Sequence, residues 1–132
     1  MQDMGEMEKR VPKNLEHFPS PGQKAYLIEF TCPEFTCLCP KTGQPDFATI
    51  YISYVPHKRC VELKSLKLYL WSYRDEGHFH EKVTNTICED LHKLLSPIYL
   101  KVMSDFYVRG GIHTTVTVTR GKKPQGVEWT TV

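Results

Sequence analysis

Two cysteines and an acid lie close together in the segment FTCLCPKTGQPDFA, residues 35–48. Cys39 precedes a proline in a stretch that reads as a loop, where functional side chains are common. Lys41 is close enough in sequence to favour the thiolate, and Asp46 follows across a Gly-Gln-Pro turn. An acid beside a thiol suits proton transfer to a covalent intermediate. The segment therefore suggests that Cys39 is a nucleophile and Asp46 its acid/base. A buried cysteine and an aspartate that caps a turn are, however, the commoner interpretation of residues at this spacing.

A second group of reactive side chains occurs in HFHE, which contains His78, His80 and Glu81. Zinc accepts cysteine and histidine ligands, so a zinc site that combines Cys39 with these histidines is an open alternative. Histidines two residues apart do not share a helix face, so joint ligation requires the helix to begin after them. Alternatively, Glu81 has no role in a site and simply lies in the first turn of a helix, where the helix dipole favours a carboxylate.

Basic residues form the third group. Lys64 and Lys67 are three residues apart in a segment with helical spacing, and together with Arg109 they can attract phosphates. Exposed lysines at such positions usually serve only solubility. The glycine-rich patterns typical of nucleotide cofactor sites are absent from the sequence.

Composition excludes several classes of protein. The chain has 132 residues, 40% hydrophobic and 24% charged, which is typical of one globular domain. It has no apolar run of membrane-spanning length and no secretory signal, so we expect a cytoplasmic protein with reduced cysteines. A net charge of +2 does not indicate direct nucleic-acid binding. The sequence also predicts no membrane partner.

The hydrophobic pattern predicts an α+β domain. Residues 1–24 are polar and proline-containing, and are expected to form an N-terminal arm or disordered tail, with the single domain over 25–132. A loop is expected over 33–47. The expected strands are 25–32, 48–55, 98–111 and 113–121, with Arg109-Gly110-Gly111 as the last hairpin connection, and the expected helices are 62–74 and 78–97, the second ended by Pro97. This β-β-α-α-β-β order indicates one antiparallel four-stranded sheet with both helices on one face.

The segment ELKSLKLY, residues 62–69, resembles the signature of the QueF family, the NADPH-dependent nitrile reductases of queuosine biosynthesis, a tRNA modification. The segments LCPKTGQPDFATIYI and HFHE resemble the same family, in the expected order and spacing. The resemblance covers roughly residues 25–120 and suggests the short, single-domain form. It implies a tunnelling fold and the reduction of 7-cyano-7-deazaguanine to 7-aminomethyl-7-deazaguanine through a cysteine thioimidate, with two NADPH and no metal.

Carried over position by position, the resemblance makes Cys39 the nucleophile and Asp46 the acid/base. Glu81 and His80 become substrate contacts. The cofactor side is implied to comprise the signature residues together with a more distant arginine: Glu62, Leu63, Lys64, Ser65, Lys67 and Arg109.

The last predicted strand bears on how subunits assemble. Segment 113–119 is β-branched and lacks the charges that normally protect an edge strand. The family resemblance implies that subunits join such edges into barrels, and we expect a homo-oligomer, specifically a decamer of two five-membered rings.

Two other functions stay open: a zinc-dependent pterin cyclohydrolase-like enzyme of the same fold, and a non-catalytic purine- or RNA-binding module.

Overall fold

The computed structural model describes residues 13–129. The main strands and helices follow the β-β-α-α-β-β order expected for the α+β domain, with one additional short strand at the start and another just before the helices. The elements are β1 (His17–Pro19), β2 (Ile28–Leu38), β3 (Pro45–Val55), β4 (Arg59–Val61), α2 (Leu63–Trp71), the 3-10 helix η1 (Ser72–Asp75), α3 (His80–Leu95), β5 (Tyr99–Arg109) and β6 (Ile112–Gly121).

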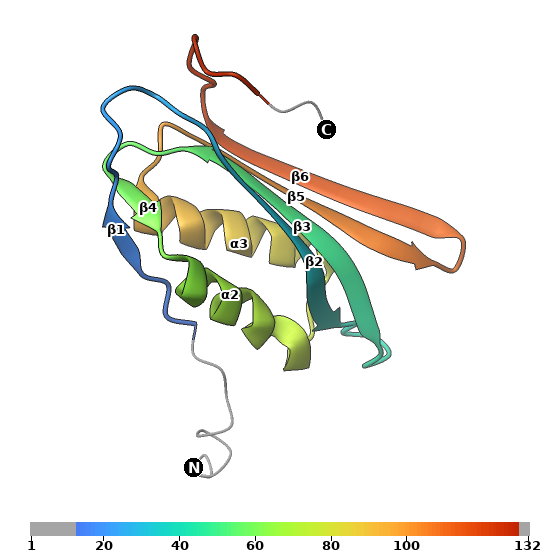
Figure 1. The fold of residues 1–132 in the computed structure, drawn as a ribbon. Coiled ribbons are helices and arrows are strands. Elements are labelled where there is room, and N and C mark those ends of the chain that lie inside the picture. Colours follow the sequence, from blue (N-terminus) through green and yellow to red (C-terminus); the bar gives the residue numbers. More distant parts are fainter. Residues whose placement is uncertain (1–12, 130–132) are drawn as a thin grey trace, which may run out of the picture.

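The main sheet has four antiparallel strands in the order β2-β3-β5-β6. Both helices cover one face of this sheet, with α2 and α3 side by side beneath it, and the β5–β6 hairpin extends beyond the helices (Figure 1). The predicted β-β-α-α-β-β order and antiparallel sheet are confirmed. The strand 113–121 is an edge strand, as predicted, and β2 forms the other edge.

The predicted loop over residues 33–47 is wrong for most of its length. Strand β2 continues to Leu38 and β3 already begins at Pro45, which leaves only a tight turn between them. Strand β2 accommodates Pro33 because the pairing register shifts between Cys32 and Phe35, and because β2 has no neighbouring strand on its outer side among residues 13–129. Proline is tolerated at edges and bulges, where no ladder hydrogen bond is lost.

The described part of the N-terminal arm, residues 13–24, contains strand β1. This strand pairs with β4 through His17–Val61, Phe18–Cys60 and Pro19–Arg59. The remainder of the expected arm, residues 1–12, lies outside the described residues. The arm therefore runs alongside the start of α2 rather than leaving the domain at residue 24 (Figure 1).

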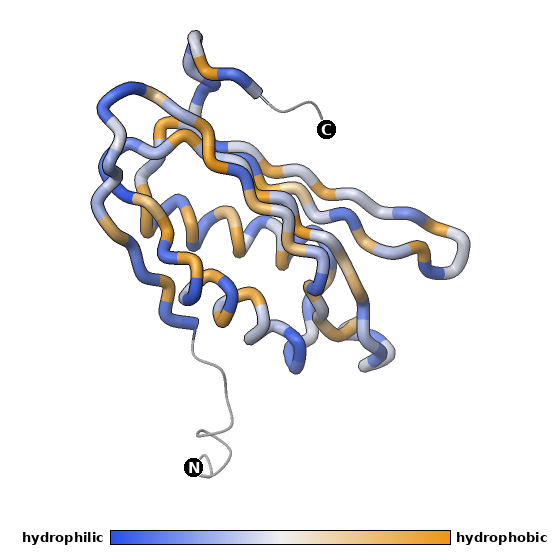
Figure 2. The backbone as a smooth tube through the Cα atoms, in the orientation of Figure 1, coloured by the Kyte–Doolittle hydropathy of each residue, from blue (hydrophilic) through white to orange (hydrophobic). Residues whose placement is uncertain are grey.

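Local sequence explains the helix boundaries. The Glu62 carboxylate accepts hydrogen bonds from the backbone N–H groups of Lys64 and Ser65, so it caps α2 at its first turn. Helix α3 ends at Ser96, which adopts a left-handed conformation, one residue before Pro97. Along α3 the residues facing the sheet are fully buried: Val83, Thr84, Ile87, Cys88, Leu91 and Leu95. Figure 2 shows hydrophobic positions recurring along this helix and along the strands above it.

The β5–β6 hairpin turns at Gly110 and Gly111, both with positive φ, which glycine adopts without strain. Within residues 13–129, none of the helices has the length and apolar character needed to cross a bilayer.

Candidate active site

Cys39 lies one residue beyond the end of β2, at the start of the turn that leads into β3. The Cys39 backbone closes this turn on both sides: its N–H donates to the Gln44 carbonyl at 2.8 Å, and its carbonyl accepts from the Gly43 N–H at 2.8 Å. Gly43 has a φ of 71°, a conformation that favours glycine. The turn therefore fixes the backbone of the candidate nucleophile.

The surroundings of the Cys39 sulfur favour its thiolate. Hydrogen bonds from the Thr42 hydroxyl, the Thr42 backbone N–H and the Lys41 backbone N–H lower the pKa of Cys39 below its usual range. The sequence predicts this effect from the charge of Lys41, whereas in the structure the largest contribution comes from Thr42. Nothing in the sequence pattern singled out Thr42, because its role depends on how the turn closes.

Cys37 contrasts with Cys39 although it is only two residues away. It is fully buried, and burial raises the pKa of Cys37 to about 12. Cys60 and Cys88 are buried too, as expected for structural cysteines, while Cys32 is half-buried. All five thiols are free, in agreement with the expectation of reduced cysteines.

Asp46 is the second residue of β3, directly opposite Cys37 in the sheet register. Its side chain is only 10% exposed, and Oδ2 lies 3.3 Å from Nε2 of His80. Arg109 approaches from the other side, with Nε 3.9 Å from Oδ1 of Asp46. The candidate acid therefore lies between two basic groups at the same end of the sheet as Cys39.

His80 is the first residue of α3, and a strand residue fixes its ring. The imidazole stacks on Phe106 of β5 with ring centroids 3.7 Å apart and an interplanar angle of 6°. One turn further along α3, the Thr84 hydroxyl has two acceptors within reach: the His80 carbonyl at 2.7 Å and Ser104 Oγ at 2.8 Å. The sequence does not single out Phe106, because this residue belongs to no motif and resembles the other hydrophobic residues of its strand.

Glu81 follows in the first turn of α3 and is exposed. No hydrogen bond to its carboxylate exists among the described residues, so its oxygens are available to a ligand. The structure thus brings together four of the predicted site residues, Cys39, Asp46, His80 and Glu81, at one end of the sheet.

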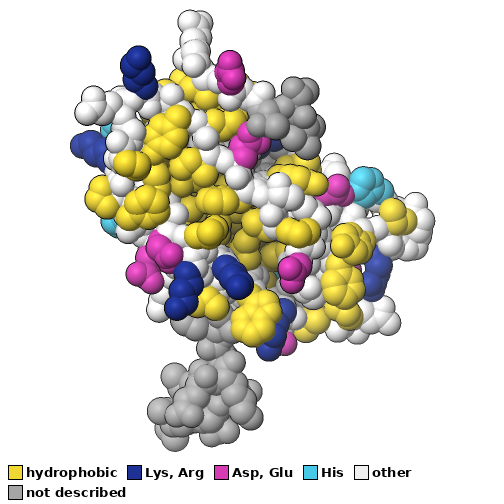
Figure 3. All heavy atoms as spheres, viewed as in Figure 1, with side chains coloured by type: hydrophobic (Ala, Val, Ile, Leu, Met, Phe, Trp, Pro, Cys, Tyr) yellow, Lys and Arg dark blue, Asp and Glu magenta, His cyan; other side chains and the backbone are white. Residues whose placement is uncertain are grey.

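The predicted cofactor residues divide into three groups. Leu63, Lys64 and Lys67 are exposed on α2, and Figure 3 shows basic side chains on the face of the molecule that α2 lines. Glu62 and buried Ser65 are engaged in capping that helix. Arg109 lies instead beside the Cys39 turn, where it donates to the Pro45 carbonyl at 2.7 Å and to Gln44 Oε1 at 3.1 Å.

Chemically, this end of the sheet combines a thiol with a lowered pKa, a buried carboxylate next to an imidazole, and a free carboxylate. Among residues 13–129 there is no cluster of three or more His, Cys, Asp or Glu side chains with the geometry of a metal site. The combination is suited to covalent addition of sulfur to an electrophilic carbon, with proton transfer to the atom that gains charge.

Comparison with known proteins gives one consistent result. Residues 45–125 match the family model described as QueF-like protein. The chain is 58% identical over 122 residues to the NADPH-dependent 7-cyano-7-deazaguanine reductase of Anaeromyxobacter sp. (strain Fw109-5), covering 92% of this chain and all of that protein. It is 63% identical over 111 residues to the enzyme of the same name from Nitrosospira multiformis, covering 83% of this chain and 80% of that protein.

A solved structure shares the fold. The apo archaeosine synthase QueF-Like superposes with a TM-score of 0.68 at 22% identity, covering 74% of this chain and 96% of that one. At this identity the likeness establishes the tunnelling-type architecture and nothing about the reaction.

Proposed function

The chain belongs to the QueF-like family, and from this membership and the geometry of the site we propose that it is an NADPH-dependent 7-cyano-7-deazaguanine reductase whose nucleophile is Cys39. The product is 7-aminomethyl-7-deazaguanine, a precursor in queuosine biosynthesis. The observation that supports the proposal most directly is the lowered pKa of Cys39 in a turn next to the Asp46–His80 pair.

The first step is addition of the Cys39 thiolate to the nitrile carbon. A carbon–sulfur bond forms, one π bond of the nitrile becomes a lone pair on nitrogen, and nitrogen takes up a proton to give a thioimidate. Asp46 is the proposed donor of this proton, and His80 lies within hydrogen-bonding distance of its carboxyl group. The stacking of His80 on Phe106 fixes the imidazole in this orientation.

The later steps use the same two groups. NADPH supplies a hydride in each of two reductions, because converting a nitrile to an amine requires four electrons. After the first reduction, the carbon–sulfur bond breaks, the thiolate of Cys39 departs and an imine forms. The Asp46–His80 pair provides the proton that the nitrogen needs when the imine is reduced. The lowered pKa of Cys39 favours its role as leaving group as well as nucleophile.

Glu81 and His80 are proposed substrate contacts. A guanine-like ring presents a ring N–H and an exocyclic amine as adjacent donors, and the free carboxylate of Glu81 can accept from both. Its position next to His80 in the first turn of α3 supports this assignment.

NADPH is proposed to bind through the exposed lysines of α2. Lys64 and Lys67 are exposed and available for its phosphates. The Glu62 carboxylate and the Ser65 hydroxyl instead form hydrogen bonds that cap the N-terminus of α2. Arg109 is assigned to the thiol end of the site, on the basis of its contacts with Pro45 and Asp46.

We further propose a homo-oligomer, a decamer of two five-membered rings, in the cytoplasm. Strands β2 and β6 are both open edges, which supports edge-to-edge joining of subunits. The reduced cysteines and the requirement for NADPH support the location.

The decisive experiment measures NADPH oxidation by the purified protein with 7-cyano-7-deazaguanine, and identifies the product by mass. We expect two NADPH consumed for each 7-aminomethyl-7-deazaguanine formed. NADPH-independent conversion, or no conversion of the nitrile, would contradict the proposal.

A further inference from the structure

A short segment between η1 and α3 joins the two sides of the candidate site. The Leu38 N–H donates to the Glu76 carbonyl at 2.8 Å, and the His78 N–H donates to the Leu38 carbonyl at 3.0 Å. The buried thiol of Cys37 also approaches the His78 carbonyl, at 4.0 Å. Leu38 immediately precedes Cys39, and His78 comes two residues before His80. This pairing therefore sets the position of the thiol relative to the start of α3.

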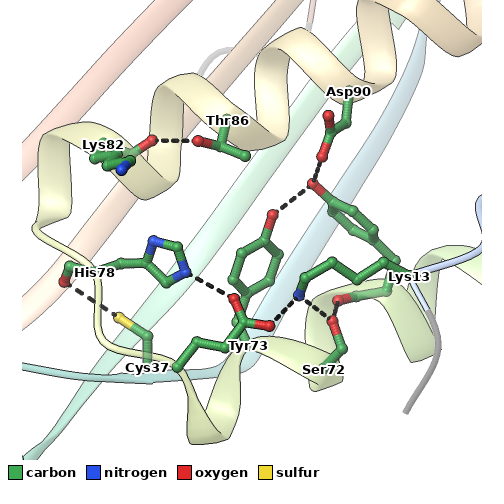
Figure 4. A network of polar contacts seen from close by, with 10 residues as sticks. Lys13, Cys37, Ser72, Tyr73, His78, Lys82, Thr86 and Asp90 are labelled. Atoms are coloured by element: carbon green, nitrogen blue, oxygen red, sulfur yellow. Dashed lines mark hydrogen bonds and ion pairs between the residues drawn. The ribbon is translucent and has the colours of Figure 1, made fainter. Parts of the chain in front are cut away.

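The Glu76 side chain reinforces this pairing with both of its oxygens. Oε1 lies 2.8 Å from Nε2 of His78, and Oε2 lies 2.8 Å from Nζ of Lys13. The His78 ring also packs edge-on against Tyr73, with ring centroids 5.3 Å apart. In Figure 4 the labelled His78 and Lys13 approach the same carboxylate from opposite sides.

Lys13 belongs to the part of the N-terminal arm that packs on the domain, residues 13–20, which we term the N-terminal strap. Its ammonium group lies 3.6 Å from the centroid of the Tyr73 ring and donates to Ser72 Oγ at 2.6 Å. Further along, the strap is held by β1–β4 pairing. Lys13 is thus an anchored partner for Glu76 rather than a freely moving surface lysine.

From these contacts we propose that Glu76 is a positioning residue for the nitrile reduction, which fixes the segment before Cys39 against the segment before His80 and couples both to the N-terminal strap through Lys13. The inference rests on the proposed function of Cys39 and His80. It assigns a role to Lys13 and Glu76, which no motif identified, and gives His78 a structural role in place of the zinc ligation considered for HFHE.

The charge state of Glu76 is consistent with this role. Burial alone would raise the pKa of Glu76, but the hydrogen bonds from His78 and Lys13 outweigh it and the net pKa is lowered. Glu76 is therefore a carboxylate at neutral pH, able to accept from both partners at once.

The expected effect is on geometry more than on stability. The Glu76 and Lys13 side chains are 40% and 34% exposed, and ion pairs this exposed contribute little to folding. A displacement of about 1 Å between reacting groups, in contrast, can reduce the rate about 100-fold. Loss of Glu76 should thus affect the site while leaving the fold intact.

The test compares Glu76→Gln with Glu89→Gln in the full-length protein. Glu89 is the matched control because it also forms a surface ion pair, with Arg120 at 2.6 Å, but this pair joins α3 to β6. Three properties are measured: the thermal unfolding temperature, kcat/KM for the nitrile, and the pH profile of Cys39 alkylation by iodoacetamide, followed by peptide mass mapping. The alkylation profile does not depend on the identity of the reaction.

For Glu76→Gln we expect a fall in kcat/KM of about 10- to 100-fold. The alkylation profile should shift to higher pH, because the donors to the sulfur, Lys41 and Thr42, belong to the turn that begins just after Leu38. The unfolding temperature should change little, and Glu89→Gln should match the wild type throughout. If Glu76→Gln does not fold, the same measurements are made on Lys13→Met. This variant should lower kcat/KM and shift the alkylation profile to higher pH, both by less than Glu76→Gln.

A wild-type alkylation profile in the folded variant would overturn the inference, whatever its activity. Absence of nitrile turnover in the wild type, with the alkylation shift still present, would instead contradict the proposed function alone.

Discussion

The Nε2 atom of His80 lies 3.3 Å from Oδ2 of Asp46, although the two residues are 34 positions apart in the sequence. Asp46 begins β3 and His80 begins α3, so the contact exists only because the helix starts beside that end of the sheet. The proposed acid is consequently paired with a second proton carrier, next to the turn that holds Cys39.

Cys39 should form a covalent adduct with the nitrile when NADPH is withheld. Denaturing mass spectrometry should show the protein plus one whole substrate, because addition releases no leaving group. Cys39→Ala should abolish the adduct, and Cys37→Ala, which changes a buried thiol with a pKa of about 12, should retain it. An adduct that maps to Cys37 would contradict the assignment of the nucleophile.

Thr42→Val should shift the pH profile of Cys39 alkylation upward. The Thr42 hydroxyl is the first contributor to the lowered pKa of Cys39, so its removal raises that pKa and reduces the thiolate fraction near neutral pH. Alkylation rates should be lower than wild type at neutral pH and should converge with wild type above the new pKa. Thr86→Val, on the exposed side of α3, serves as the control. An unchanged profile would mean that backbone N–H groups alone set the reactivity.

Asp46→Asn should bind the substrate but lose most of its reduction. The amide cannot supply the proton that nitrile addition requires, and removal of a general acid typically costs about 10²- to 10⁴-fold in rate. The measurement is single-turnover NADPH oxidation together with calorimetric substrate affinity. Asp105→Asn is a suitable control, since Asp105 pairs with His113 instead of His80. Near-normal turnover would show that another group donates the proton.

Glu81→Gln should weaken substrate binding by about 1–3 kcal/mol, because one acceptor oxygen is replaced by a donor that faces the donors of the purine. Isothermal calorimetry with 7-cyano-7-deazaguanine measures the change directly. Glu89→Gln on the same helix controls for loss of a negative charge from α3. Equal affinities in the wild type and Glu81→Gln would remove Glu81 from the site.

Activity should fall on dilution if active sites depend on neighbouring subunits. Sedimentation velocity and specific activity, measured at matched protein concentrations, should decline together as the proposed decamer dissociates. A monomer that keeps full specific activity would show that each chain contains a complete site.

Much of the fold could be predicted from the sequence because its signals are local. The buried stripe of α3, including Val83, Ile87 and Leu91, follows helical spacing, and Pro97 marks where that helix must have ended. The β-branched residues of β6 likewise identify a strand. Cys39, Asp46, His80 and Glu81 could be selected as site candidates because their types, order and spacing resemble one family.

The rest was decided by tertiary structure. Strand β2 continues past Pro33 because it is an edge strand with a register shift, which a local proline signal cannot reveal. The stacking of Phe106 on His80, the ion pair of Glu76 with Lys13 and the position of Arg109 beside Asp46 join segments far apart in the chain. Such contacts arise only when the helices pack on the sheet. The sequence alone therefore determines which residues can react, whereas packing determines which of them meet.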